Sequence, residues 1–298
     1  MKEVIFLGTS SMAPTKERNH PSFVIRYGKE LILFDCGEGT QRQLKYAKLS
    51  SNKISRIFIS HWHGDHVLGL PGLLQTLAAN NYNGKLEIFG PETTIKRINK
   101  LIEIFPFERE FTMNILEIKK DGLIYENEKY SIFAREVEHS VKCFGFKFVE
   151  KDKINLDKKL LKKFGLKEGP YLQELKKGRN IRINGKTIKP TDVGRVIPGK
   201  KIGYIADTTI CDNAYLIAED TDILICEATF DQDLEEKARN RLHLTCKDAA
   251  LIASQANAKK LVLFHFSQRY DDVSNLIEHA KEIFPNTVGA YDFMKIKF

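Results

Sequence analysis

The chain lacks the features that mark membrane and secreted proteins. No apolar run approaches the roughly 20 residues that a membrane-spanning helix needs, and Met1 to Glu3 lead directly into a strand-like run instead of a signal peptide. The five cysteines are scattered, odd in number and without a CxxC pair, which is typical of reduced, buried thiols. These absences argue against a disulfide framework and predict a cytoplasmic protein with no membrane segment.

Two sequence patterns alternate along the 298 residues, of which 42% are hydrophobic. Short β-branched runs predict strands and amphipathic stretches predict helices, an alternation typical of an α/β fold with its sheet buried under helices. The expected strands are Val4–Leu7, Phe23–Arg26, Leu31–Phe34, Arg56–Ile59, Leu86–Phe89, Ile132–Val137, Lys201–Ile205, Ile223–Cys226 and Leu261–Phe264. The expected helices are Gln41–Ala47, Leu70–Ala79, Thr94–Phe105, Thr245–Gln255 and Val273–Phe284.

The net charge of +8 comes from one segment of the chain. Thirteen Lys or Arg against four Asp or Glu give residues 151–189 a net charge of +9, so the rest of the chain is close to neutral. This segment has a Gly-Pro break at Gly169 and Pro170, and its apolar residues look too sparse for a core, apart from one short amphipathic helix between Leu156 and Phe164. We expect residues 151–189 to form a basic arm inserted into a single domain of residues 1–298; a solvated linker is the alternative.

The segment FISHWHGDHVLGLPG places four metal-ligating side chains within six positions, directly after an expected strand. Residues two apart on an extended backbone point the same way, so His61 and His63 can share one metal ion. A turn at Gly64 lets Asp65 and His66 face a second position nearby. Imidazole and carboxylate together suit zinc, although manganese or iron could occupy such a site.

Three more candidate ligands lie farther along the chain, each just after an expected strand. They are His139, Asp207 and His265. Because ligand sites in open sheets gather at strand ends, this placement is the one that a metal centre requires. We therefore expect these side chains to meet the first four.

The order HxHxDH, lone His, lone Asp and last His resembles the metallo-β-lactamase superfamily. The resemblance implies a four-layer αββα fold and two Zn²⁺ ions per subunit. It also implies that Asp35, in the segment LFDCGEGTQ, orients a ligand histidine from behind. By the same resemblance one ion would be held by His61, His63 and His139, the other by Asp65, His66 and His265, with Asp207 bridging.

Further motifs narrow the resemblance from the superfamily to one of its families. The segment PTKERN contains the pattern PxKxRN, and the stretches FDCGEGTQRQL, GLPGLLQTL, EATF, HLT and HFSQRY follow. Together they resemble the ribonuclease Z family in its short form, over essentially the whole chain. The resemblance implies an endoribonuclease that removes the 3′ trailer from precursor tRNA just after the discriminator base, leaving a 3′-hydroxyl on the tRNA and a 5′-phosphate on the trailer.

The same resemblance implies how the substrate is held. The basic arm would grip the tRNA elbow, with Gly169 and Pro170 at the position of the family's Gly-Pro pair. Lys16, Arg18 and Asn19 would lie near the acceptor end and help to sense a terminal CCA. The family also implies a homodimer in which the arm of one subunit presents tRNA to the other subunit's site.

Cleavage of a phosphodiester needs a proton for the departing 3′-oxygen. The resemblance implies Glu227 and His243 for this role, and Asp65 as both ligand and general base. Thr245 is typical of an N-cap with Asp248 three residues on, which would fix His243 ahead of a helix. The alternatives are an ion pair at a sheet edge for Glu227 and a surface position for His243.

This chain departs from the family pattern at three positions: Cys226 and Leu244 replace the His of HEAT and the Ser of HST, and Ala206 replaces the usual Gly before the bridging Asp. None removes a proposed ligand. Two other functions stay open. A hydrolase of small phosphodiesters or esters would not need the arm, and a non-catalytic tRNA-binding protein would not need the ligands.

Overall fold

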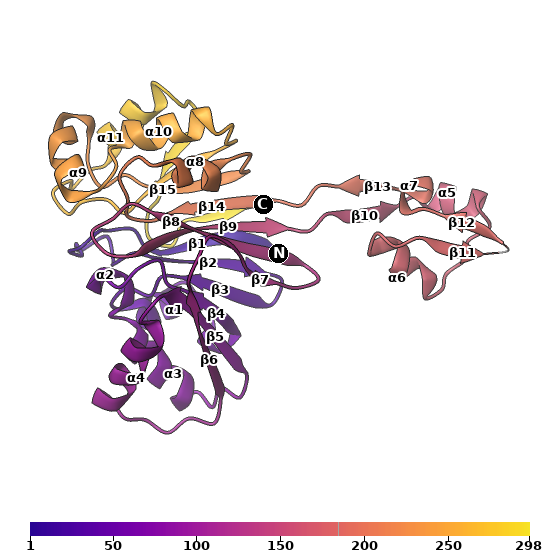
Figure 1. Cartoon of the computed structure of the whole chain (residues 1–298), viewed down its shortest axis with the longest axis horizontal. Coiled ribbons are helices and arrows are strands. Elements are labelled where there is room, and N and C mark those ends of the chain that lie inside the picture. Colours follow the sequence, from indigo (N-terminus) through magenta and orange to yellow (C-terminus); the bar gives the residue numbers. More distant parts are fainter. Residues whose placement is uncertain (184) are drawn as a thin grey trace.

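The computed structural model describes residues 1–183 and 185–298, and Asn184 of the predicted arm lies outside them. Within this part of the chain two seven-stranded sheets stack face to face, with helices on both outer sides (Figure 1). The first sheet has the order β18-β1-β2-β3-β4-β5-β6 and the second the order β17-β16-β15-β14-β9-β8-β7. The four-layer αββα architecture expected from the sequence is confirmed.

Most expected strands and helices end within about two residues of the observed ones. The strands of the first sheet are β1 (Lys2–Gly8), β2 (Ser22–Tyr27), β3 (Glu30–Phe34), β4 (Ile54–Phe58), β5 (Lys85–Pro91), β6 (Thr112–Ile118) and β18 (Lys295–Lys297). Those of the second are β7 (Gly122–Glu126), β8 (Tyr130–Val137), β9 (Cys143–Glu150), β14 (Lys201–Ile205), β15 (Ile223–Glu227), β16 (Leu261–Phe264) and β17 (Thr287–Gly289). The helices outside the arm are α1 (Thr40–Tyr46), α2 (Gly64–Val67), α3 (Leu70–Ala79), α4 (Thr94–Ile104), α8 (Asp212–Ala218), α9 (Glu235–Arg241), α10 (Cys246–Gln255) and α11 (Ser274–Lys281), with short 3₁₀ turns η1 (Ser51–Lys53) and η2 (Gln232–Leu234).

Both faces of the central strands are buried, which explains their nearly continuous apolar sequence. In β1, Val4 and Phe6 face the second sheet, while Ile5 and Leu7 face the helices α1 and α3. Aromatic rings fill the space between the two sheets: the rings of Phe23 and Tyr204, one from each sheet, meet edge to face with centroids 5.0 Å apart.

Parallel strands bring several carboxyl ends to the same end of the sandwich. The strands β3 to β6 run parallel in the first sheet, and β14 to β17 run parallel in the second. The segments that follow β4, β14, β15 and β16 therefore meet at one end of the molecule. Each of these segments carries side chains of the candidate site.

The chain between β9 and β14 projects from the opposite end of the sandwich (Figure 1). A two-stranded stalk, β10 (Lys153–Leu156) and β13 (Gly194–Ile197), carries a small tip. Because β13 continues to Ile197, the projection runs past the predicted limit of 189. The tip is built from α5 (Lys158–Lys163), α6 (Tyr171–Lys176), β11 (Ile181–Ile183), β12 (Lys186–Ile188) and α7 (Pro190–Val193).

The expectation that the arm has no core is wrong. Five side chains of the tip, spaced widely in the sequence, are buried against one another: Leu166, Leu175, Ile181, Ile188 and Val193. Leu166 comes from the loop between α5 and α6 and the other four from different short elements, so no periodic pattern in the sequence predicts the cluster.

In the described part of the chain no helix is long and apolar enough to span a membrane.

Candidate metal centre and active site

The residues of the HxHxDH motif turn from strand β4 into helix α2. His61 and His63 lie on extended backbone after the strand, and the first turn of α2, which starts at Gly64, presents Asp65 and His66. The backbone N–H of Phe144 at the start of β9 donates to the carbonyl of Ser60, which ties this turn to the second sheet. The turn at Gly64 predicted from the sequence thus separates the four side chains as expected.

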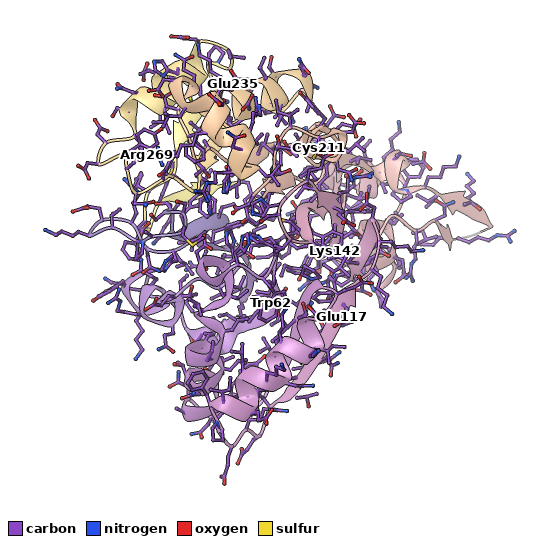
Figure 2. All side chains as sticks on the ribbon, turned by 60° about the vertical axis from the view of Figure 1, so that its left-hand side comes forward. Trp62, Glu117, Lys142, Cys211, Glu235 and Arg269 are labelled. Carbon is purple, nitrogen blue, oxygen red and sulfur yellow. The ribbon has the colours of Figure 1, made fainter. Side chains whose placement is uncertain are left out.

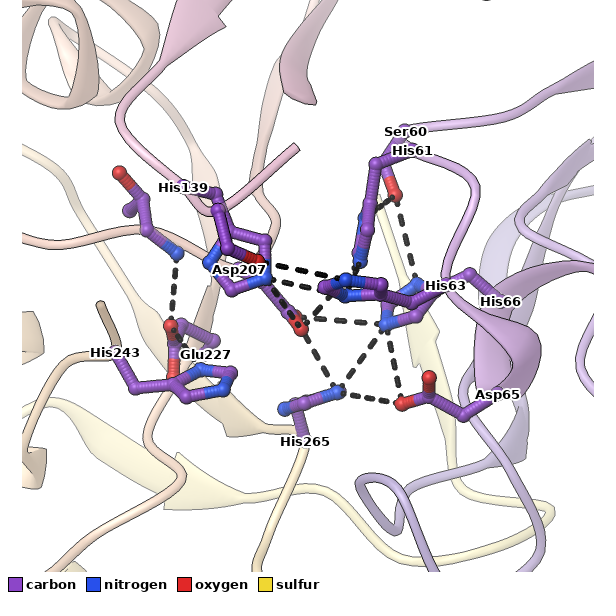
Figure 3. A network of polar contacts seen from close by, with 12 residues as sticks. Ser60, His61, His63, Asp65, His66, His139, Asp207, Glu227, His243 and His265 are labelled. Carbon is purple, nitrogen blue, oxygen red and sulfur yellow. Dashed lines mark hydrogen bonds and ion pairs between the residues drawn. The ribbon is translucent and has the colours of Figure 1, made fainter. Parts of the chain in front are cut away.

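Seven candidate ligands from both sheets converge in two adjacent groups (Figure 3). His61, His63, His139 and Asp207 form one group, with 3.0 Å between His61 Nε2 and His63 Nδ1 and 3.2 Å between His139 Nε2 and His63 Nδ1. Asp65, His66, His265 and again Asp207 form the other group. Asp207 lies between the two: its Oδ2 is 3.6 Å from His61 Nε2 and its Oδ1 is 3.3 Å from His265 Nε2.

Hydrogen bonds to the Nδ1 atoms fix the orientation of two histidine rings, those of His66 and His139. Asp35 Oδ2 accepts from His66 Nδ1 at 2.8 Å, from the hydroxyl of Tyr204 at 2.6 Å and from that of Ser60 at 2.9 Å. On the other side, His139 Nδ1 lies 3.0 Å from the carbonyl oxygen of Leu242. Both contacts leave the Nε2 atom of the ring directed into the site, the arrangement typical of metal-ligating histidines.

Two residues of this framework have backbone conformations that side chains other than glycine rarely adopt. Asp35 has φ 52° and His265 has φ 62°. Left-handed conformations at non-glycine residues persist only where the surroundings impose them, and they gather at functional sites. The backbone therefore supports a functional role for this end of the sandwich.

The protonation states of most groups in the site suit cation binding, whereas the pKa of His66, which burial alone would lower, is raised well above its ordinary value by the carboxylates of Asp65, Asp207 and Asp35. Burial lowers the pKa values of His61, His63 and His139, which keeps these rings neutral and able to donate a lone pair. Burial alone would raise the pKa values of Asp65 and Asp207, but the neighbouring histidines lower them below their usual range. Ionised carboxylates and neutral imidazoles are the forms that bind metal ions.

The carboxylates also have atoms free to bind cations. Among the described residues, Asp65 Oδ1 and Asp207 Oδ1 are buried without a hydrogen-bond partner. A buried carboxylate oxygen in this state is costly unless something positive lies beside it. The donor set of the two groups therefore fits divalent cations.

A second cluster of polar groups adjoins the ligands. His243 Nδ1 lies 2.9 Å from Glu227 Oε1, which also accepts from the backbone N–H of Thr208 at 2.9 Å. Burial would lower the pKa of His243, but Glu227 raises it to about 9. Glu227 is fully buried at the end of β15, an interior strand and not an edge strand of the sheet, and its ion-pair partner there is His243.

Thr229 connects the two clusters, and the sequence analysis missed it. Its hydroxyl donates to Glu227 Oε2 at 2.6 Å and lies 2.9 Å from Nδ1 of the ligand candidate His265. The stretch EATF contained this threonine, but the contact with His265 depends on the pairing of β15 with β16. Ser60 and Tyr204 were missed because their contacts with Asp35 depend on how β3, β4 and β14 lie together in space. The predicted cap of α10 by Thr245 and Asp248 is confirmed.

The three predicted residues of the PxKxRN loop differ in exposure. Arg18 is only 8% exposed, and its guanidinium donates to the carbonyl oxygens of Ser267 and Tyr270, so it holds two loops together. Asn19 is half-buried, donates to the carbonyl of Glu38 at 2.7 Å and lines a small neighbouring cavity. Lys16 is exposed, as expected.

Gly169 and Pro170 lie in the arm tip, at the start of α6 and far from the metal centre in space (Figure 1). The eight residues of β9 separate the site from the base of the arm. At about 3.3 Å per residue this is roughly 25 Å. The predicted arm contacts therefore form a second, remote region.

A cavity of about 560 Å³ opens over the metal ligands. Figure 2 turns this end of the molecule toward the viewer, with Arg269 above and Trp62 below. The cavity contacts His63, His139, Asp207 and His265 at its floor, and its walls include residues of the segment after β1, of α9 and of the loop after β16.

The fold is that of the metallo-β-lactamase proteins, with the candidate metal centre at one end of the sandwich. A metallo-β-lactamase fold protein from Bacillus subtilis superposes with a TM-score of 0.72 at 19% identity, covering 100% of this chain and 99% of that one. A sequence model described as anti-Pycsar protein Apyc1 matches residues 2–142.

Full-length relatives identify the family. The chain is 41% identical to ribonuclease Z of Pyrococcus horikoshii, covering 99% of this chain and 96% of the relative, and 37% identical to that of Methanothermobacter thermautotrophicus, covering 100% and 97%. The crystal structure of human tRNase Z, short form, superposes with a TM-score of 0.73 at 29% identity, covering 99% of this chain and 98% of that one. The chain belongs to the ribonuclease Z family, and both the family and the fold imply a divalent metal centre.

Proposed function

We propose that this protein is a cytoplasmic, zinc-dependent endoribonuclease that removes the 3′ trailer from precursor tRNA by hydrolysis just after the discriminator base. The proposal rests on one observation. Two ligand groups that share Asp207 lie beside the Glu227–His243 pair. Hydrolysis of a phosphodiester needs an activated water on one side and a proton donor on the other. The two adjacent clusters would supply these two functions.

Seven side chains would hold the cations: His61, His63, His139, Asp65, His66, His265 and the bridging Asp207. Two bound Zn²⁺ ions would supply Lewis acidity at a phosphoryl oxygen and acidify a water molecule. Mn²⁺ or iron would suit the same donor set.

Two side chains of the protein, Asp65 and His243, would carry out the proton transfers. Asp65 faces His66 and His265 with Oδ2, which leaves Oδ1 to accept a proton from the attacking water. The water oxygen bonds to phosphorus as the bond from phosphorus to the 3′-oxygen breaks. His243, kept protonated by Glu227, donates a proton to that departing oxygen, so the tRNA ends in a 3′-hydroxyl and the trailer keeps the phosphate.

The arm supplies affinity at a distance from the chemistry. Its net charge of +9 suits the phosphates of a folded RNA, because phosphate contacts supply much of the affinity for nucleic acids. The arm leaves the sandwich at the end opposite to the site (Figure 1), a placement that favours a homodimer in which each arm serves the partner's site. Gly169 and Pro170 would contact the tRNA elbow, and Lys16 the acceptor end.

The test is cleavage of a precursor tRNA with a 3′ trailer in the presence of Zn²⁺, with product ends mapped for wild type and Asp65→Ala. We expect one cut just after the discriminator base in the wild type and a loss of at least about a thousandfold in the variant. Metal content measured on the same samples shows whether the sites are filled. Absence of cleavage by protein that holds two metal ions would contradict the proposal.

A further inference from the structure

Helix α9 presents two cations to the cavity beside the proton donor. Lys237, Asn240 and Arg241 of this helix contact the cavity, together with His243 and the metal ligands. Lys237 and Arg241 are four residues apart and so lie on the same face of the helix. Both side chains are exposed.

Arg239, the third basic residue of α9, is paired with carboxylates. Arg239 is bound by both oxygens of Asp248, at 2.8 and 2.9 Å, and also contacts Glu235. In contrast, the ion pairs formed between described residues include neither Lys237 nor Arg241. Like charges four residues apart cost a helix a few tenths of a kcal/mol, so this pair favours an anion between or beside the two groups.

The position of α9 is tied rigidly to His243. The backbone N–H of His243 donates to the carbonyl of Ala238 at 2.9 Å, and Leu242 takes the left-handed conformation with φ 55°. The carbonyl of Leu242 in turn contacts the ligand candidate His139. Arg241 is therefore held at the side of the cavity where the departing oxygen receives its proton.

We infer that Lys237 and Arg241 form a phosphate subsite for the strand that carries the departing 3′-oxygen. This strand consists of the nucleotides on the 5′ side of the cut. This inference rests on the proposed function, because it uses His243 to identify the side from which the 3′-oxygen leaves. The strand that carries that oxygen must pass His243, and its next phosphates then meet α9. The trailer keeps the scissile phosphate and leaves on the other side.

The first test compares two short RNA ligands with wild type, Lys237→Gln and Arg241→Gln. One is an unphosphorylated pentanucleotide with a 3′-hydroxyl, which mimics the strand on the 5′ side of the cut; the other is a pentanucleotide with a 5′-phosphate and a blocked 3′ end, which mimics the trailer. We expect each substitution to weaken the first ligand about three- to tenfold in fluorescence anisotropy and to lower the salt dependence of its binding by about one unit. The second ligand should lose less than about twofold.

The matched control is Lys100→Gln, which removes one exposed helical charge from α4, away from the cavity. It should bind both ligands as the wild type does. Equal losses for the two ligands, or none in either variant, would overturn the subsite. Cleavage of precursor tRNA by the wild type tests the proposed function separately. If the wild type cleaves but the variants bind both oligonucleotides normally, only the subsite is contradicted. If the wild type does not cleave, the proposed function is contradicted.

Discussion

The two ends of the molecule differ in nearly every physical property. At one end, buried carboxylates and imidazoles are held by hydrogen bonds to surrounding groups and by backbone in rare conformations. At the other end, a two-stranded stalk carries a small tip with five buried apolar side chains and an excess of exposed cations. Bond cleavage requires atoms fixed by a rigid core, whereas binding a large polyanion requires charge and reach, so each end suits one of these tasks.

The largest expected effect is at Asp207, which both ligand groups share. Asp207→Asn should lower kcat for precursor tRNA by at least about a thousandfold and reduce the bound metal to less than one equivalent, because a neutral amide cannot bridge two cations. Activity assays and elemental analysis of the same sample check this. Asp222→Asn, which alters a carboxylate paired with Lys200 and Lys259, is the control. Full metal content in Asp207→Asn would contradict the assignment.

The proton donor should have the next largest effect. His243→Gln should lower kcat about 10²- to 10⁴-fold, the range for loss of a general acid, while the metal content stays at the wild-type value. Single-turnover kinetics of precursor cleavage measure it. His279→Gln removes a comparable histidine–carboxylate contact, with Asp231, that involves none of the seven candidate ligands. If both variants lost activity equally, His243 would have a structural role.

Neutralising the arm should affect binding more than chemistry. Replacing Lys158, Lys159, Lys162 and Lys163 of α5 by Gln should raise KM for precursor tRNA at least about tenfold and reduce the salt dependence of binding. The effect on kcat should be within about threefold. A variant with Lys96→Gln and Lys100→Gln in α4 serves as the control. A KM equal to that of the wild type would place the RNA elsewhere.

These two regions also differ in how far the sequence predicted them. The HxHxDH turn was predicted because its ligands follow a strand within six residues, and most expected strands lie where the structure has them. The burial of Arg18 was not predicted because its carbonyl partners are some 250 positions away in the chain. The tip core was missed because Leu166 and Val193 join through short elements with no common period.

The smallest expected effect concerns the base of the arm. Glu150 is buried and accepts from Tyr27 at 2.6 Å, from Lys2 and from Lys153 of the stalk. Burial alone would raise the pKa of Glu150, but these hydrogen bonds lower it from its usual 4.5 to about 2. Because the folded-state pKa is depressed, this carboxylate stabilises the fold above pH 4.5, and its contribution is lost as the pH falls from 4.5 toward 2.

Glu150→Gln should therefore lower the melting temperature by a few degrees at pH 7, and the difference from wild type should shrink as the pH falls below 4.5. Thermal melts across this pH range measure the change. Glu126→Gln, which alters a carboxylate on the surface beside Lys151, should leave the melts unchanged. A Glu150→Gln deficit that is constant with pH would show that the carboxylate charge is not the cause.

The most direct test of the account is to cleave precursor tRNA in water enriched in ¹⁸O and to analyse both product ends by mass spectrometry. Attack by water on the phosphorus, with protonation of the 3′-oxygen, predicts one ¹⁸O atom in the 5′-phosphate of the trailer and an unlabelled 3′-hydroxyl on the tRNA. A 2′,3′-cyclic phosphate on the tRNA, or a trailer that ends in a 5′-hydroxyl, would contradict it.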